Sequence, residues 1–180
     1  MDNSTEGVTL ISAFVLDVIN LYEGKSDQAT LKKMVADLDL SDPMKHVPME
    51  TYNEMCDWIE TQVGKANARL LGRKIGETAY GSMVAMNMVN DTTTPSEMMK
   101  ALQQVALTVI KDPKKRGWEI VEDQPKEIVM RRTQTFNGTL QLGLLDTLVR
   151  KTKALSPSVD LFKEVSLGHE YDEYRITWLK

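Results

Sequence analysis

The chain has 180 residues and a net charge of -4, with apolar residues at 42% and charged residues at 27%. These values are close to those of ordinary globular proteins, so they exclude a disordered chain and a fibrous repeat. The length suits one apolar core but not two independent ones. We therefore expect a single domain over residues 1–180.

Membrane, secretory and nucleic-acid-binding classes are disfavoured by the same simple features. The longest apolar run, residues 8–18, is interrupted by polar residues and falls short of the roughly 18 apolar residues that a membrane span needs. The first residues contain no basic segment leading into an apolar stretch, and the chain has one cysteine, so we expect a cytoplasmic protein. A net negative charge disfavours phosphate binding, and we interpret the one basic cluster as the cationic end of a helix: Lys111, Lys114, Lys115 and Arg116.

Helical spacing of apolar residues dominates the first half of the chain. It predicts helices over residues 8–22, 27–38, 49–63 and 66–89, with a loop over residues 41–48 that two prolines bracket. Three glycines lower the helix propensity of the last of these segments and favour a kink or a break there: Gly72, Gly76 and Gly81.

The clearest start of a helix is the sequence Thr94-Pro95-Ser96-Glu97. Thr94 suits the N-cap, Pro95 the first turn, and Glu97 completes a capping box. The pattern predicts a helix over residues 94–111. Its apolar stripe includes the residues that we expect to line any internal pocket: Leu102, Val105, Ala106 and Val109.

After Gly117 the apolar period changes from helical to alternating. The pattern predicts strands over residues 118–121 and 127–132, a helix over 139–155, and strands over 161–166 and 171–178. In the last strand Tyr174, Ile176 and Trp178 alternate with polar residues, so we expect them to be buried under helices. The predicted class is α+β, with N-terminal helices packed on a small antiparallel sheet of strand-strand-helix-strand-strand order.

No sequence motif for nucleotide binding, zinc proteolysis or serine hydrolysis is present, so we expect no catalytic residues, no metal site and no enzyme activity. His46 and His169 fall in predicted turns and are expected at the surface. Cys56 shares an apolar helical stripe and is expected to be buried and inert. Near the last hairpin an acidic group could bind a cation, but strand spacing points its side chains to opposite faces, so we expect them to be solvated: Glu164, His169, Glu170, Asp172 and Glu173.

Three segments resemble a known family: residues 8–22 (VTLISAFVLDVINLY), 140–151 (LQLGLLDTLVRK) and 162–178 (FKEVSLGHEYDEYRITW). They are similar to the first helix, the penultimate helix and the closing hairpin of haem-nitric oxide/oxygen binding (H-NOX) domains. That superfamily also includes 4-vinyl reductase sensor domains and TRAPP Golgi-transport subunits. The resemblance in element order extends over nearly the whole chain, and it implies a fold that encloses an apolar ligand between helices and sheet.

The resemblance implies haem as the cofactor, but the residues that hold haem in the family are not found. In the family, a histidine on the helix before the sheet binds the iron, and aligning residues 98–109 places Ala106 at its position. The propionate-binding Tyr-x-Ser-x-Arg motif is absent from residues 130–137 (MRRTQTFN), although we expect Arg131 and Arg132 to be able to reach an anionic group. The zinc-binding cysteines of the sister sensor domains are absent as well, so the cofactor stays open.

Three functions remain after this comparison. The first is a sensor or regulatory domain that binds a small apolar or haem-like molecule and signals to a partner protein; the fold resemblance and eleven methionines favour it. The second is a structural interaction module whose pocket is filled by side chains. The third is a haem gas sensor with a non-standard axial ligand such as His46.

Overall fold

The computed structural model describes residues 1–179 and has an α+β architecture. The helices are α1 (Ala13–Leu21), α2 (Gln28–Met34), α3 (Met49–Trp58), α4 (Lys65–Ala85), α5 (Pro95–Val109) and α6 (Gly138–Arg150). The strands are β1 (Thr9–Ile11), β2 (His46–Pro48), β3 (Ile110–Lys111), β4 (Trp118–Gln124), β5 (Glu127–Arg132), β6 (Ser158–Lys163) and β7 (Asp172–Thr177). A five-residue π-helical segment, Ile59–Val63, follows α3, and a 3₁₀ turn, Val165–Leu167, precedes β7.

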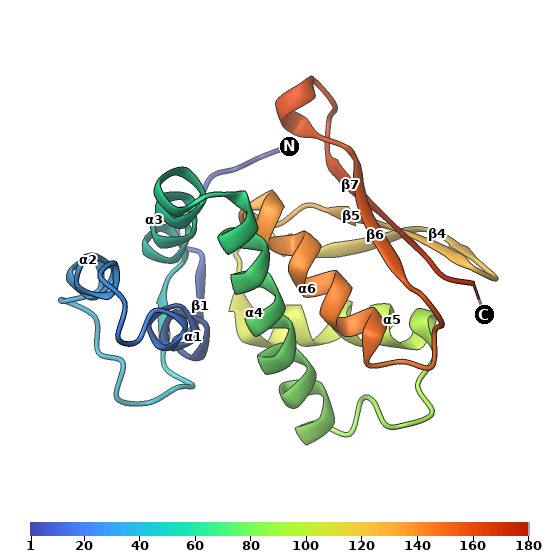
Figure 1. The fold of residues 1–180 in the computed structure, drawn as a ribbon, viewed down its shortest axis with the longest axis horizontal. Coiled ribbons are helices and arrows are strands. Elements are labelled where there is room, and N and C mark those ends of the chain that lie inside the picture. The colour runs from blue at the N-terminus through green and yellow to red at the C-terminus, as the bar shows by residue number, and fades with distance from the viewer. Residues whose placement is uncertain (180) are drawn as a thin grey trace.

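The strands form two antiparallel sheets at opposite sides of a helical layer. The larger sheet has the order β4-β5-β7-β6 and the smaller one β2-β1-β3. Figure 1 shows α4 and α6 side by side in the centre, with the larger sheet on one side and α1, α2 and α3 on the other. α5 packs against β4, α4 and α6. No helix within residues 1–179 is long and apolar enough to cross a membrane.

The inner face of the larger sheet carries the apolar alternation expected from the sequence. Ile128 pairs with Ile176 and Met130 with Tyr174, and all four side chains are fully buried. The expectation for Trp178 is wrong in degree, because this residue is only partly buried. It lies just beyond the end of β7 at Thr177, and it still packs against the edge of the core.

The outer face of the same sheet is a row of alternating charges. Arg131 of β5 lies 3.5 Å from Glu119 of β4 and 2.8 Å from Glu173 of β7, and Lys163 of β6 lies 2.7 Å from Glu173. Opposite charges on directly adjacent strands stabilise their pairing. The expectation that the acidic group near the last hairpin is solvated is therefore wrong for Asp172 and Glu173, which are buried. The strand register places Asp172 opposite Arg132 and Glu173 opposite Arg131, and each acid forms an ion pair with its arginine.

The smaller sheet was not predicted. Residues 9–11, expected as the start of a helix, form β1 because Leu10 pairs with Val47 on one side and with Ile110 on the other. His46 correspondingly lies in a strand rather than in a turn. Local apolar spacing cannot detect these pairs, since the partner strands come from distant parts of the sequence.

The capping box of α5 is confirmed. The Thr94 side chain accepts a hydrogen bond from the Glu97 amide, and the Glu97 carboxylate accepts one from the Thr94 amide. Several predicted boundaries are wrong by a few residues: α5 ends at Val109 where β3 begins, α6 ends at Arg150, and β6 starts at Ser158. Helix and strand ends are set by tertiary pairing as much as by local sequence.

α4 and α6 approach each other so closely that only glycine fits at their contact. A Cβ atom on Gly72 would lie 1.9 Å from the Leu140 carbonyl oxygen, and one on Gly143 would lie 2.0 Å from the Arg69 carbonyl oxygen. A Cβ atom on Gly76 would likewise lie 2.7 Å from the Cβ atom of Thr147. The expected break is absent, since α4 is one continuous helix, and Gly72 and Gly76 serve interhelical packing instead.

We predict that Gly143→Ala lowers the free energy of unfolding by at least about 3 kcal/mol, because the new methyl group would overlap the backbone of α4. Gly81→Ala is the matched control on α4, since a Cβ there meets no atom within 4 Å. The control is expected to raise stability by up to about 1 kcal/mol through helix propensity. Urea denaturation of both variants measures the difference, and equal stabilities would contradict the proposed close contact.

Candidate functional site

A small apolar cavity lies where α5 meets α4, α6 and β4, and its volume is about 30 Å³. All four residues that the sequence predicted for a pocket contribute to its wall: Leu102, Val105, Ala106 and Val109. The other lining residues are Phe14, Ile75, Ala79, Ile110, Trp118, Phe136, Leu140, Gln141 and Leu144.

The helical repeat of α5 explains why the four predicted residues lie together. Positions 102, 105, 106 and 109 follow the i, i+3, i+4, i+7 spacing that puts side chains on one face of a helix. Each of the four is at most 7% exposed. The capping box fixes where this helix begins, and thereby which face it turns toward the interior.

Two aromatic rings occupy much of the space around the cavity. Trp118 packs edge-on against Tyr174 with ring centroids 5.5 Å apart, and Phe136 packs edge-on against Tyr52 at 5.6 Å. Such pairs are favourable beyond the burial of their surface. Because Trp118 and Phe136 are themselves lining residues, the cavity is a remnant between packed rings and not a preformed ligand chamber.

Gln141 is the one lining residue that carries an amide, hydroxyl or charged group. It is 1% exposed, and its Oε1 has no hydrogen-bond partner within residues 1–179. A buried amide oxygen without a partner is costly. Sequence reasoning missed this residue, although its place as a lone polar residue in the apolar run 140–145 was a visible signal.

We predict that Gln141→Met raises the free energy of unfolding by about 1 kcal/mol, because it removes an unsatisfied buried amide at similar volume. Gln103→Met is the matched control: Gln103 Nε2 donates to the Trp118 carbonyl oxygen at 2.9 Å, so its loss should destabilise by about 1 kcal/mol. Thermal unfolding of the two variants measures both effects. Destabilisation by Gln141→Met would show instead that the amide has a bound partner in solution.

Arg131 and Arg132, which the sequence suggested could reach an anionic ligand, already form ion pairs with carboxylates of this chain. Arg132 is buried, forms an ion pair with Asp172, and donates to the Gln134 carbonyl oxygen at 3.0 Å. Arg131 is bound to Glu173 and Glu119 on the outer face. Burial opposes ionisation of Glu173, but hydrogen bonds from Lys163 and Arg131 outweigh it and lower the pKa of this carboxyl group.

Neither histidine lines the cavity. His46 Nδ1 lies 3.0 Å from Thr9 Oγ1 in β1, and partial burial together with the nearby charge of Lys111 lowers the pKa of the imidazole. His169 is exposed beside the turn that precedes β7. Cys56 is buried as expected, and burial raises the pKa of its thiol. Residues 1–179 contain no group of three or more histidine, cysteine or acidic side chains that could hold a metal ion.

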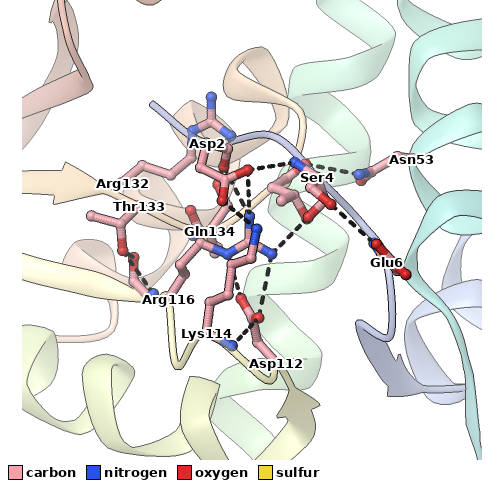
Figure 2. A network of polar contacts seen from close by, with 12 residues as sticks. Asp2, Ser4, Glu6, Asn53, Asp112, Lys114, Arg116, Arg132, Thr133 and Gln134 are labelled. Atoms are coloured by element: carbon pink, nitrogen blue, oxygen red, sulfur yellow. Dashed lines mark hydrogen bonds and ion pairs between the residues drawn. The ribbon is translucent and has the colours of Figure 1, made fainter.

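A network of polar contacts connects residues 2–4 to the turn between β3 and β4 (Figure 2). Arg116 donates to Asp112 Oδ2 at 2.6 Å, to the Asp2 carbonyl oxygen at 2.9 Å and to the Ser4 carbonyl oxygen at 2.7 Å. Lys114 lies 2.5 Å from the Asp2 carboxylate. This turn is therefore held in one conformation by its own charges and by residues 2–4.

The arrangement of helices and sheets is similar to that of solved H-NOX proteins. The Fe(II) unliganded H-NOX protein from K. algicida aligns with a TM-score of 0.65 at 11% identity, covering 95% of this chain and 97% of that chain. The S. oneidensis H-NOX protein in the Fe(II)NO state aligns with a TM-score of 0.64 at 8% identity, covering 93% and 99%. The chain has an H-NOX-like fold. No protein-family model matches the sequence, and no curated protein is significantly similar to it.

The H-NOX-like fold implies haem, but the residues present do not fit this group. Ligand pockets of drug-sized molecules occupy roughly 300–1,000 Å³, at least about ten times the cavity found here. The wall supplies no imidazole, thiolate or phenolate to bind iron. The arginines of β5 are neutralised by carboxylates and are not available to propionates.

We predict that haemin gives no shifted Soret band with the purified protein, because the interior has neither room nor an axial ligand. The variant Ala106→His supplies an imidazole on the cavity wall, and it too is expected to bind no haem because Trp118 and Phe136 still fill the space. Titration with haemin, followed by absorbance, measures both. A tight complex of the wild-type protein would contradict the packed interior, and a complex of the variant alone would show that the cavity opens.

Proposed function

We propose that this domain regulates a partner protein by direct contact, and that it does so without haem. The observation that carries the proposal is the filled interior: the cavity on α5 measures about 30 Å³ and is walled by packed aromatic and aliphatic side chains. Without a chamber for a cofactor, what remains of an H-NOX-like domain is a rigid scaffold with a specific surface. The proposal takes partner regulation from the first function that the sequence left open, and the filled pocket from the second, the structural interaction module.

A non-catalytic role belongs to the same proposal. The buried carboxylates and the buried Arg132 are engaged in ion pairs, as in Arg132 with Asp172 and Arg131 with Glu173. A catalytic site needs a nucleophile or a general base that faces a space for substrate. The polar side-chain groups of the lining residues are the amide of Gln141 and the indole N–H of Trp118, and neither serves these purposes. A cytoplasmic location and a protein partner rather than a nucleic acid agree with the single cysteine and the net charge of -4.

A second candidate function is the sensing of a small apolar molecule within the cavity. The apolar wall and the unpartnered Gln141 Oε1 favour it. Met98 and Met99 are fully buried on α5, and methionine side chains adapt readily to a changed volume. At the present volume, however, the site admits one or two water molecules or a diatomic gas, so a larger ligand must first displace side chains.

Native mass spectrometry of the protein purified from the cells that produce it tests the proposal. We expect a complex with a second polypeptide in fixed stoichiometry and no mass increment from a porphyrin. The same preparation is then released from its partner, and the mass of the chain is compared with that of the protein expressed alone.

Three results would decide between the alternatives. A porphyrin adduct on the chain would overturn the haem-free proposal. A small non-porphyrin adduct, displaced by Gln141→Met, would favour ligand sensing. A bare chain without a partner would contradict a regulatory role through direct contact.

A further inference from the structure

An open groove of about 560 Å³ lies beside the C-terminal end of α5, outside the packed interior. We call it the Leu107 groove. Its walls come from the last turns of α5, from the turn between β3 and β4, and from the segment before β1. The lining residues are Gly7, Leu107, Ile110, Lys111, Asp112, Pro113, Lys115 and Arg116.

The groove has an apolar floor with one strongly exposed side chain. Leu107 is 59% exposed, more than any other large apolar side chain in the α-helices and β-strands of residues 1–179. The neighbouring Ala106 and Ile110 are each 7% exposed, so α5 turns one face to the interior and Leu107 to the groove. Pro113 adds a second exposed apolar surface beside it.

The free charges of the groove are cationic. The carboxylate of Asp112 is bound by Arg116 at 2.6 Å, and that of Asp2, next to the groove, by Lys114 at 2.5 Å. Lys111 and Lys115 line the groove, are exposed, and form no ion pair within the described part of the chain. An occupant that brings carboxylates gains attraction from both lysines.

Hydrogen bonds within the chain brace the turn that forms one wall of the groove. In the turn after β3, the Lys115 amide donates to the Asp112 carbonyl oxygen at 2.9 Å and the Lys114 amide to the Asp112 carboxylate at 2.8 Å. Figure 2 shows the Lys114 side chain at Asp2 and the Arg116 side chain at Ser4 of the N-terminal segment, with Arg116 also bound to Asp112. A preformed groove loses less entropy on binding than a flexible one.

We propose that the Leu107 groove binds an acidic segment of the partner protein, with an apolar side chain of that segment packed on Leu107 and Pro113. The inference rests on the proposed function and names its partner surface. Charge complementarity selects the occupant: two free lysines beside an apolar floor suit carboxylates and an apolar anchor on one peptide. Two free cations are too few for a polyphosphate backbone, where affinity grows with the number of phosphates neutralised.

To test binding to the groove, we use a fluorescein-labelled amphipathic peptide of 14 residues, which would form about four helical turns. It carries leucine at positions i, i+3, i+4 and i+7 and glutamate at every other position. A second peptide carries lysine in place of every glutamate. Fluorescence anisotropy with the full chain measures the dissociation constant of each. We expect saturable binding of the acidic peptide only, weakened by added salt.

Two variants test the apolar and the cationic parts of the Leu107 groove separately. Leu107→Asp and the double variant Lys111→Glu/Lys115→Glu are each expected to weaken binding about tenfold or more. The controls are Leu70→Asp, at a 43% exposed leucine on α4, and Lys32→Glu/Lys33→Glu at the end of α2; both should bind like wild type. Thermal melting confirms that all four variants are folded.

The proposal is overturned if the acidic peptide shows no saturable binding, if the basic peptide binds equally well, or if the groove variants bind like the controls. These failures are distinct from failure of the proposed function. If native mass spectrometry still finds a partner complex that survives Leu107→Asp, regulation by contact stands and the groove is the wrong surface.

Discussion

The close packing of α4 on α6 is the constraint on which the rest of the fold depends. Gly72 and Gly143 bring the two backbones together, and any side chain at either position would overlap a carbonyl group of the other helix. α6 in turn packs on β6 and β7, and α4 on α1 and α5. The spacing of α4 and α6 is therefore set by a backbone contact that no change of side-chain rotamer can relieve.

The close spacing of α4 and α6 limits the space inside, because both helices line the cavity. Side chains fill the space between α5, α6 and β4, with Trp118 and Phe136 occupying much of it and about 30 Å³ left over. The same packing isolates Gln141 from hydrogen-bond partners. Apolar side chains of α4, α5, α6 and β4 thus provide much of the burial in this part of the H-NOX-like fold.

Charges are arranged around this interior in two different ways. On the larger sheet they neutralise one another across adjacent strands, as Arg131 does with Glu119 and Glu173. At the end of α5 the acids are bound by Arg116 and Lys114, which leaves two lysines beside an exposed leucine. The first arrangement stabilises the sheet, whereas the second leaves a surface with unbalanced charge and an apolar floor.

The sequence by itself determined the fold class, the capping box at Thr94 and the four pocket residues of α5, because each depends on short-range spacing along one helix or strand. The tertiary structure decided everything that depends on distant pairing. It turned residues 9–11 into a strand, assigned Gly72 to helix packing, and placed Asp172 against Arg132. It also decided the size of the cavity, since volume follows from how layers pack and from no local pattern.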